Sequence, residues 1–163
     1  DQKNKIEEDE KRDSEAEDII DGSQNESTDP VIIKNVKILN KEKKRTKVFR
    51  IMDDVCLEIQ ALAQKKLEKY YIEINVVRAD GLFCYGCSTV SDEIEMEEWI
   101  GERQLHIVFE KVNLIQGKYH CDIHVANEDG STIFFGGNIV EFEIENDRLE
   151  RGLVYIEHKW IGA

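Results

Sequence analysis

The sequence contains one proline and ten glycines among its 163 residues, so it is neither collagen-like nor a proline-rich linker. It lacks any uninterrupted apolar run near the roughly 18 residues that a membrane-spanning helix needs. Positive charge is in deficit, because 22 lysines and arginines stand against 35 aspartates and glutamates, and the formal net charge is −13. So acidic a chain is poorly suited to a nucleic-acid groove or an anionic membrane surface as its main partner.

Recognisable catalytic motifs are also absent from the sequence. It contains no GxSxG, no HExxH and no GxxxxGK[ST] pattern, which removes the common signatures of serine hydrolases, zinc proteases and P-loop enzymes. Among 35 acidic residues some pair could always be drawn as the two carboxylates of a glycosidase, so their abundance carries no signal. We therefore expect a protein without catalytic activity in these residues.

Four cysteines are present, and Cys84 and Cys87 have the CxxC spacing of zinc half-sites and redox motifs. No second CxxC completes a set of four ligands. We expect this pair on a strand, where residues three apart point to opposite faces of the sheet and cannot share one metal ion. The favoured interpretation is that the cysteines are reduced and structural.

The first residues differ in composition from the rest of the chain. Residues 1–29 contain twelve acidic and four basic residues and no aromatic residue, a composition that cannot bury enough apolar surface to offset chain entropy. We expect residues 1–30 to be an acidic linker, disordered or weakly helical. Because the chain begins at Asp1 without a methionine, we also expect it to be a piece of a longer protein.

From Val31 onward, short runs of alternating or β-branched residues recur between turn signals such as Asp80-Gly81 and Asp129-Gly130. The expected strands are residues 31–39, 46–51, 55–63, 70–77, 82–88, 104–109, 118–126, 132–135, 139–144 and 153–160. Many short strands with regular turns and little helix predict an all-β protein, a two-sheet antiparallel sandwich. We therefore assign residues 31–163 to one β-sandwich domain.

A tyrosine narrows the type of sandwich. Tyr119 follows a Gln116-Gly117 turn and precedes Cys121 by two residues, which is the pattern of the tyrosine corner in immunoglobulin-like sandwiches. The sequence therefore predicts an immunoglobulin-like β-sandwich in which residues 118–126 form a central strand. Its neighbours in the same sheet would be residues 70–77 and 139–144.

Three stretches carry a resemblance to a known family. They are residues 48–51 with 54–59, residues 71–74 with 78–83 (RADGLF) and 86–89, and residues 114–119 (LIQGKY) with 142–144, 152–156, His158 and Trp160. In this order they resemble the C-terminal carbohydrate-binding domain of Wzt-type proteins, the ATP-binding subunits of ABC transporters that export O-antigen polysaccharides. The cysteines are a departure, because the family does not need them.

The resemblance implies a function and a setting. Such a domain would follow a nucleotide-binding domain, and ATP would be a cofactor of that domain only. It would bind the terminal or capped end of an undecaprenyl-linked polysaccharide and give the exporter its substrate specificity. The domain would be cytoplasmic, at the inner face of the cell membrane beside the permease subunit. It would form a homodimer, and exchange of the C-terminal strand, residues 153–160, between its protomers is compatible with the family.

A candidate glycan site follows from the polar positions of the three neighbouring strands. Sugar recognition needs planar polar side chains at fixed angles and often an aromatic platform. The candidate carbohydrate-binding residues are Tyr71, Glu73, Asn75, His120, Asp122, His124 and Glu141, with Glu143 beside them. The plainer alternative is that these residues are the solvated half of an ordinary two-faced sheet.

Other interpretations of the same residues remain open. His120, Asp122 and His124 could ligate a metal with help from Glu73 or Glu141, which would allow a metal-dependent enzyme. The sandwich could instead be a dimerisation or docking module without glycan binding. The favoured expectation is glycan binding with no metal and no nucleic acid.

Among the aromatic residues, Tyr70 and Tyr119 share the parity of core positions and are predicted to be structural. Trp160 is expected to fill the sandwich edge or a dimer contact, and Trp99 to lie in a loop between strands. A loop or edge aromatic could stack on a sugar, and the candidates are Trp99, Tyr85, Phe134 and Phe135. For each of them a position in the core is the favoured alternative.

Overall fold

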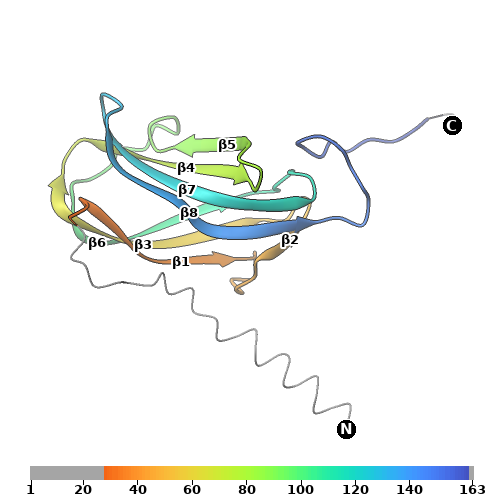
Figure 1. Cartoon of the computed structure of the whole chain (residues 1–163), viewed down its shortest axis with the longest axis horizontal. Helices are drawn as coiled ribbons and strands as arrows, with labels where there is room; N and C mark the ends of the chain where they lie inside the picture. Colours follow the sequence, from red (N-terminus) through yellow and green to blue (C-terminus); the bar gives the residue numbers. More distant parts are fainter. Residues whose placement is uncertain (1–27, 162–163) are drawn as a thin grey trace, which may run out of the picture.

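The computed structural model describes residues 28–161 and consists of eight strands joined by turns and loops (Figure 1). The strands are β1 (Val31–Leu39), β2 (Val48–Arg50), β3 (Val55–Leu67), β4 (Tyr70–Arg78), β5 (Phe83–Ser88), β6 (Trp99–Phe109), β7 (Gly117–Asn127) and β8 (Thr132–Glu145). The predicted linker lies outside the described residues except for residues 28–30. No helix within the described part of the chain has the length and apolar run that crossing a bilayer requires.

The strands form two sheets packed face to face (Figure 1). Sheet A has the order β1-β3-β6, and sheet B has the order β2-β8-β7-β4-β5. The pairings are antiparallel except for the short strand β2, which runs parallel to β8. The predicted two-sheet sandwich is confirmed, and so is the place of β7 between β4 and β8.

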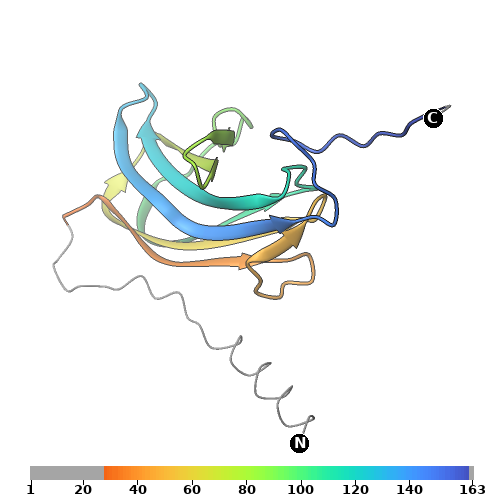
Figure 2. The ribbon, with the colours of Figure 1, turned by 45° about the vertical axis from the view of Figure 1, so that its right-hand side comes forward.

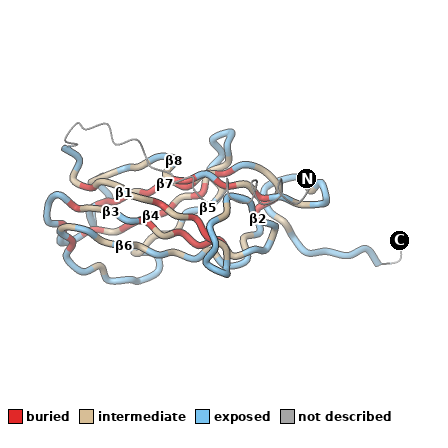
Figure 3. Tube along the Cα trace, turned by 90° about the horizontal axis from the view of Figure 1, so that it is seen from below, coloured by how far each residue is buried: buried red, intermediate tan, exposed pale blue. Residues whose placement is uncertain are grey.

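The core lies between the sheets and is built from alternate residues of each strand. Leu57 and Ile59 of β3 and Ile123 and Val125 of β7 belong to this core, and each of these side chains is at most 1 % exposed. Figure 3 shows the buried positions concentrated along the paired strands. Burial of such apolar side chains is the main favourable contribution to folding, so the period-2 pattern decides which face of each strand turns inward.

The tyrosine corner is present. The buried hydroxyl of Tyr119 donates a hydrogen bond to the carbonyl oxygen of Ile115 at 2.9 Å, and its ring stacks on Phe142 with centroids 5.6 Å apart. Burial raises the pKa of the Tyr119 phenol, so it stays a neutral donor. This contact fixes the chain that enters β7, the strand from which the polar face described below is built.

Two strand predictions need correction. Residues 132–135 and 139–144 are not separate strands but parts of the single strand β8, because the Gly136-Gly137 pair between them, expected from its composition to be a turn, lies at a bulge. Strand β6 begins at Trp99, not at residue 104, and the Trp99 indole is 1 % exposed. The indole nitrogen donates to the Gly101 carbonyl at 2.8 Å. Trp99 is therefore a core residue and not an aromatic platform for a sugar in a loop.

The predicted strand at residues 153–160 is wrong for this chain. Val154 makes an isolated antiparallel bridge with Leu114, and the segment then runs outward past the end of β8 (Figure 1). Trp160 is 85 % exposed, so it does not fill the sandwich edge. A strand needs a neighbouring strand for its backbone hydrogen bonds. The backbone hydrogen bonds that tie this segment to the sandwich involve Leu153 and Tyr155, at its beginning.

The four cysteines are free thiols. The expectation that Cys84 and Cys87 point to opposite faces is wrong, because both side chains pack against the core. A register shift between Val76 and Val77 disturbs the alternation of β5 at this point. Burial raises the pKa of the Cys121 thiol to about 12, which is the behaviour of a structural cysteine.

Candidate functional site

The structure places all seven candidate residues on the outward side of sheet B, opposite the core. They alternate with buried neighbours along their strands, as Glu73 does with Ile72 and Ile74 on β4. We call this surface the polar face and define it by Tyr71, Glu73, Asn75, His120, Asp122, His124 and Glu141. Their common location follows from strand pairing alone, while their role in binding stays a prediction.

Strand register brings the candidates into cross-strand rows. Glu73 lies opposite His124, and Asn75 lies opposite Asp122. His120 lies opposite Glu141, and Glu143 lies opposite Lys118 at the end of the same face. Directly opposite residues in an antiparallel pair have Cβ atoms about 4.5–5.5 Å apart, so one small ligand could contact several of these side chains together.

The polar face is curved. β7 and β8 are long and bend toward their shared hairpin, away from β1 and β3 (Figure 2). The outward side of sheet B is therefore the inner side of this bend. A concave, outward-facing sheet can surround more of a ligand than a flat one, which favours binding over simple solvation.

A bulge in β8 organises the centre of the polar face. Register jumps from Cys121–Val140 to Ile123–Gly136, which leaves the residues around Asn138 as extra length opposite Asp122. Asn138 has a φ of 50°, a conformation that asparagine tolerates better than most residues. Its backbone N–H donates to Asp122 Oδ1 at 2.7 Å, and its side-chain amide donates to Glu141 Oε1 at 2.8 Å. The bulge thus holds two predicted carboxylates in place.

The same aspartate also lies beside a histidine. His120 Nε2 is 3.4 Å from Asp122 Oδ1, and their side chains are 23 % and 14 % exposed. Asp122 is therefore half-enclosed by an imidazole on its own strand and an amide on the next. Oxygen and nitrogen atoms held at fixed angles in this way are the groups that pair with sugar hydroxyls.

One end of the polar face is aromatic. The His124 ring meets Tyr71 edge-on with centroids 6.3 Å apart, and it meets Phe135 at the same centroid distance. His124 Nε2 also shares a hydrogen bond of 2.9 Å with Thr132 Oγ1. Phe135 is 57 % exposed, so this cluster presents ring surface to solvent beside the polar row.

A hollow of about 420 Å³ lies at the opposite end of the polar face. It is lined by the predicted residues His120, Glu141 and Glu143 together with Asn138, Lys47 and Lys118. The two lysines place positive charge next to the carboxylates. This hollow and the aromatic cluster are the two ends of one continuous surface along β7 and β8.

The metal alternative gains no set of ligands from the described residues. Within residues 28–161 no group of three or more histidine, cysteine, aspartate or glutamate side chains is placed so that it could hold a metal ion. The imidazole of His124 is engaged with Thr132 and two aromatic rings.

Sequence reasoning missed several members of this surface. Asn138 falls between the strands expected at residues 132–135 and 139–144. Phe83 and Gly86 of β5 contribute to the family resemblance but are not among the candidate binding residues, although both lie beside β4 on the same side. The available signal for Asn138 was a Gly-Gly-Asn run inside an otherwise continuous β pattern, which is typical of a bulge. The other aromatic candidates divide: Phe134 packs against the core, and Tyr85 faces Phe109 of sheet A.

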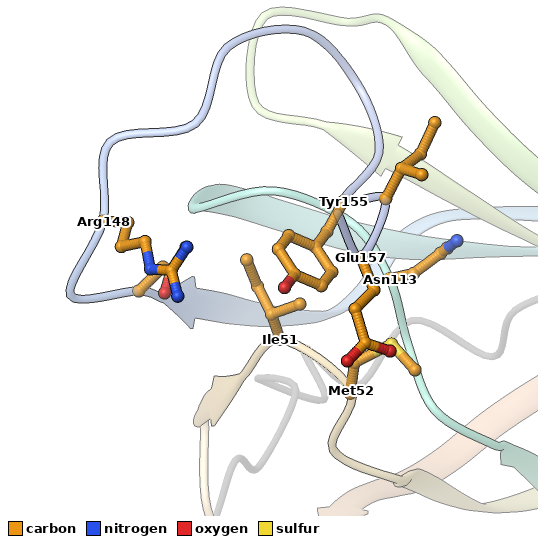
Figure 4. Close-up of a pocket in the computed structure, with 8 residues that line it drawn as sticks. Ile51, Met52, Asn113, Arg148, Tyr155 and Glu157 are labelled. Atoms are coloured by element: carbon orange, nitrogen blue, oxygen red, sulfur yellow. The ribbon is translucent and has the colours of Figure 1, made fainter. Parts of the chain in front are cut away.

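A second hollow, of about 570 Å³, lies away from the polar face. Figure 4 shows Tyr155 and Glu157 of the C-terminal segment around it, with Ile51 and Met52 from the turn after β2. It contains none of the predicted site residues. The C-terminal segment forms part of the wall of this hollow. A backbone hydrogen bond from the Tyr155 N–H to the Asn113 carbonyl oxygen holds that segment in place.

Comparison with known proteins identifies relatives. The family model described as the Wzt C-terminal domain matches residues 23–156. The crystal structure of the C-terminal domain of Wzt superposes with a TM-score of 0.70 at 12 % identity, covering 83 % of this chain and 85 % of that one. An alkylpurine DNA glycosylase AlkC of Pseudomonas fluorescens matches with a TM-score of 0.44 at 11 % identity, over 72 % of this chain and 31 % of that one. No curated protein sequence matches the chain.

Proposed function

The chain belongs to the Wzt C-terminal domain family, and we propose that it is a carbohydrate-binding module that recognises the polysaccharide exported by an ABC transporter. In this role it selects the glycan by its terminal or capped end and gives the exporter its substrate specificity. Binding takes place on the polar face, and no reaction is catalysed there. ATP hydrolysis belongs to a nucleotide-binding domain elsewhere in the protein.

The observation that carries the proposal is the combination on one concave surface of exposed rings and half-enclosed polar groups. Sugars present weakly apolar C–H faces beside many hydroxyls. Phe135 and Tyr71 supply ring surface around His124, and Asp122 and Glu141 supply acceptors that are already oriented by Asn138. A surface that was merely solvated would not need this orientation.

The charge of the polar face favours a particular kind of glycan. Glu73, Asp122 and Glu141 lie within it, and Glu143 extends the acidic row at one end. Lys47 and Lys118 offset this charge at the hollow. Along the rest of the row, at Glu73 and Asp122, anionic sugars such as uronic acids would be repelled by the carboxylates, because like charges in close contact cost free energy. A neutral polysaccharide is therefore the favoured ligand class, and its binding should respond weakly to salt.

The family also supports a proposed setting. The domain acts in the cytoplasm at the inner face of the membrane, beside a permease subunit, where an undecaprenyl-linked glycan is handed to the transporter. A single face of this size, which stays open to solvent, is suited to dissociation constants between about 1 mM and 1 μM, or roughly −4 to −8 kcal/mol. Such affinity permits the glycan to be released for export.

A second function, dimerisation, is favoured by the C-terminal segment. It ends in apolar side chains that the described chain leaves uncovered: Leu153, Val154, Ile156, Trp160 and Ile161, which are between 46 % and 87 % exposed. Exposed apolar residues in an extended segment suit pairing with a second protomer. We propose a homodimer in which the two protomers exchange this segment. The dimer binds the glycan; the alternative is that the domain serves only to dimerise or dock the transporter subunits.

The test is a titration of the isotopically labelled 163-residue chain with O-polysaccharide, released by mild acid from the lipopolysaccharide of the bacterium that encodes it. Backbone amide shifts should be saturable and centred on His120, Asp122 and His124. Asp122→Ala should weaken binding by more than about tenfold. Light scattering on the same sample reports whether the chain is a dimer.

A matched control comes from the other sheet. Glu58→Ala removes a carboxylate that also lies beside a histidine, His106, but on the outward side of sheet A, and it should leave binding unchanged. Saturable shifts confined to sheet A would move the site. No shift at millimolar glycan, with a dimer in solution, would leave docking as the function.

A further inference from the structure

The β5 side of the polar face holds a glycine where a side chain would be expected to project. Gly86 pairs with Asn75, and Phe83 pairs with Val77. A Cβ atom added to Gly86 would lie 2.6 Å from Asn75 Oδ1 and 2.9 Å from Phe83 Cζ. The amide oxygen and the tip of the ring therefore share the space that a side chain at position 86 would fill.

The amide oxygen in this space lacks a donor. Asn75 Oδ1 is fully buried and accepts no hydrogen bond from the described residues. Buried carbonyl oxygens are nearly always paired, because an unsatisfied acceptor forfeits its bond to water without compensation. This acceptor lies at the surface of a sheet, where a small change of cover would restore contact with solvent or with a ligand.

The cover itself is loosely held. Phe83 is 58 % exposed, although its ring tip, like Asn75 Oδ1, lies within 3 Å of the point where a Cβ atom on Gly86 would stand. It lies on β5, the edge strand of sheet B, which pairs only with β4 in this sheet. An exposed ring on an edge strand can change rotamer without disturbing the core, since few neighbours constrain it.

We propose that Phe83, Gly86 and Asn75 form a subsite for one uncharged sugar ring, which extends the polar face across β4 to β5. The Phe83 ring turns away from Gly86 and stacks on the C–H face of the sugar. A sugar hydroxyl then donates to Asn75 Oδ1 and satisfies the unpaired acceptor. Gly86 is required because only a residue without a side chain leaves room for the hydroxyl.

This subsite rests on the proposed function and adds a specificity to it. A binding site that contains an unpaired acceptor discriminates strongly against ligands that lack the matching donor. A sugar whose hydroxyl at this point is methylated or missing would leave Asn75 Oδ1 unpaired and should bind less well. The subsite therefore reads one hydroxyl, while Asp122 and its neighbours bind the remainder of the glycan.

The experiment uses the same O-polysaccharide and the 163-residue chain, and it compares four variants with the wild type by calorimetry. Phe83→Ala and Asn75→Ala should each weaken binding by about tenfold, and Gly86→Ala by at least about threefold. The matched control is Tyr85→Ala, which removes an exposed ring from the same strand. The Tyr85 ring instead faces Phe109 of sheet A, so its loss should leave binding unchanged.

The outcomes separate the two proposals. If the wild type binds and Asp122→Ala abolishes binding, but Phe83→Ala and Gly86→Ala bind normally, the subsite is overturned and the proposed function stands. If the wild type does not bind the polysaccharide, both are overturned. If Phe83→Ala binds more tightly than the wild type, the ring is only an obstructing cover, and the stacking role is wrong. Amide spectra of each variant establish that the fold is retained.

Discussion

The outward faces of the two sheets carry the same chemical pair in different surroundings. On sheet A, Glu58 lies 3.8 Å from His106 on the neighbouring strand, and the histidine side chain is 54 % exposed. On sheet B, Asp122 lies 3.4 Å from His120 on its own strand, and that histidine is 23 % exposed. A histidine beside a carboxylate is therefore not what distinguishes the candidate site.

The difference lies in what surrounds each pair. Pairing of β3 with β6 is regular from Val55 to Ala63, and Glu58 faces Lys37 on its other side. On sheet B the partner strand bulges at Asn138, and rings flank the row at Phe135. Regular alternation of polar residues is typical of a solvated sheet. The bulge that re-aims side chains and the exposed Phe135 ring are what distinguish the face of sheet B, and the proposed binding function depends on them.

The largest effect we expect from disturbing this difference comes from the bulge. Asn138→Ala removes the amide that donates to Glu141 Oε1 and places a Cβ-bearing residue with poorer tolerance at a φ of 50°. Glycan binding should weaken by about threefold to tenfold, and the free energy of unfolding should fall by about 1 kcal/mol. Calorimetric titration and urea denaturation measure the two quantities.

Asn138→Gly is the matched control for that variant. Glycine accepts the left-handed conformation and keeps the backbone N–H that donates to Asp122 Oδ1, but it lacks the side-chain amide. It should restore most of the lost stability while binding stays weakened. If Asn138→Gly recovers binding as well, the bulge acts through its backbone alone and the orientation of Glu141 is irrelevant.

A narrower effect, on one of these two quantities only, should separate the inward side of sheet B from its outward side. Tyr119→Phe removes the hydroxyl that donates to the Ile115 carbonyl but keeps the ring that stacks on Phe142. The free energy of unfolding should fall by about 1 kcal/mol with glycan affinity unchanged, because Tyr119 points into the core. Tyr71→Ala, on the outward side of β4, should weaken glycan binding and leave the free energy of unfolding nearly unchanged. A loss of binding in Tyr119→Phe would show that the corner positions the polar face.

These contrasts also show how far the sequence could lead. Period-2 alternation was sufficient to place His120 outward and Tyr119 inward, since apolar burial decides which side of a strand faces the core. The same pattern could not reveal that Asn75 lies opposite Gly86, because cross-strand contacts depend on register. Nor could it show that Gly136-Gly137 belongs to a bulge and not to a turn, since glycine is common in both. The prediction of a strand at residues 153–160 was wrong because the alternation pattern of a segment does not show whether a neighbouring strand is available to pair with it.

The smallest expected effect concerns one carboxylate near an end of each sheet. In sheet B the Arg78 guanidinium makes two hydrogen bonds with Asp80, of 3.0 and 2.7 Å, and holds the pKa of Asp80 below its ordinary value. In sheet A the Lys66 ammonium lies 2.9 Å from Glu68 and lowers the pKa of Glu68 in the same direction. Both pairs are exposed, so each contributes little.

Because both pKa values are lower in the folded state than in the unfolded chain, the stabilisation is complete above the unfolded pKa and is lost as the pH falls through the folded one. At pH 7, Asp80→Asn should lower the Tm by about 2 °C or less. Glu68→Gln should lower it by less still, because the Lys66 ammonium makes one contact with Glu68 whereas the Arg78 guanidinium makes two hydrogen bonds with Asp80. Each difference from the wild type should shrink below about pH 4. Thermal melts from pH 2 to 7 measure it, and a difference that grows with acidity would mean that neither carboxylate is stabilised by its neighbouring cation.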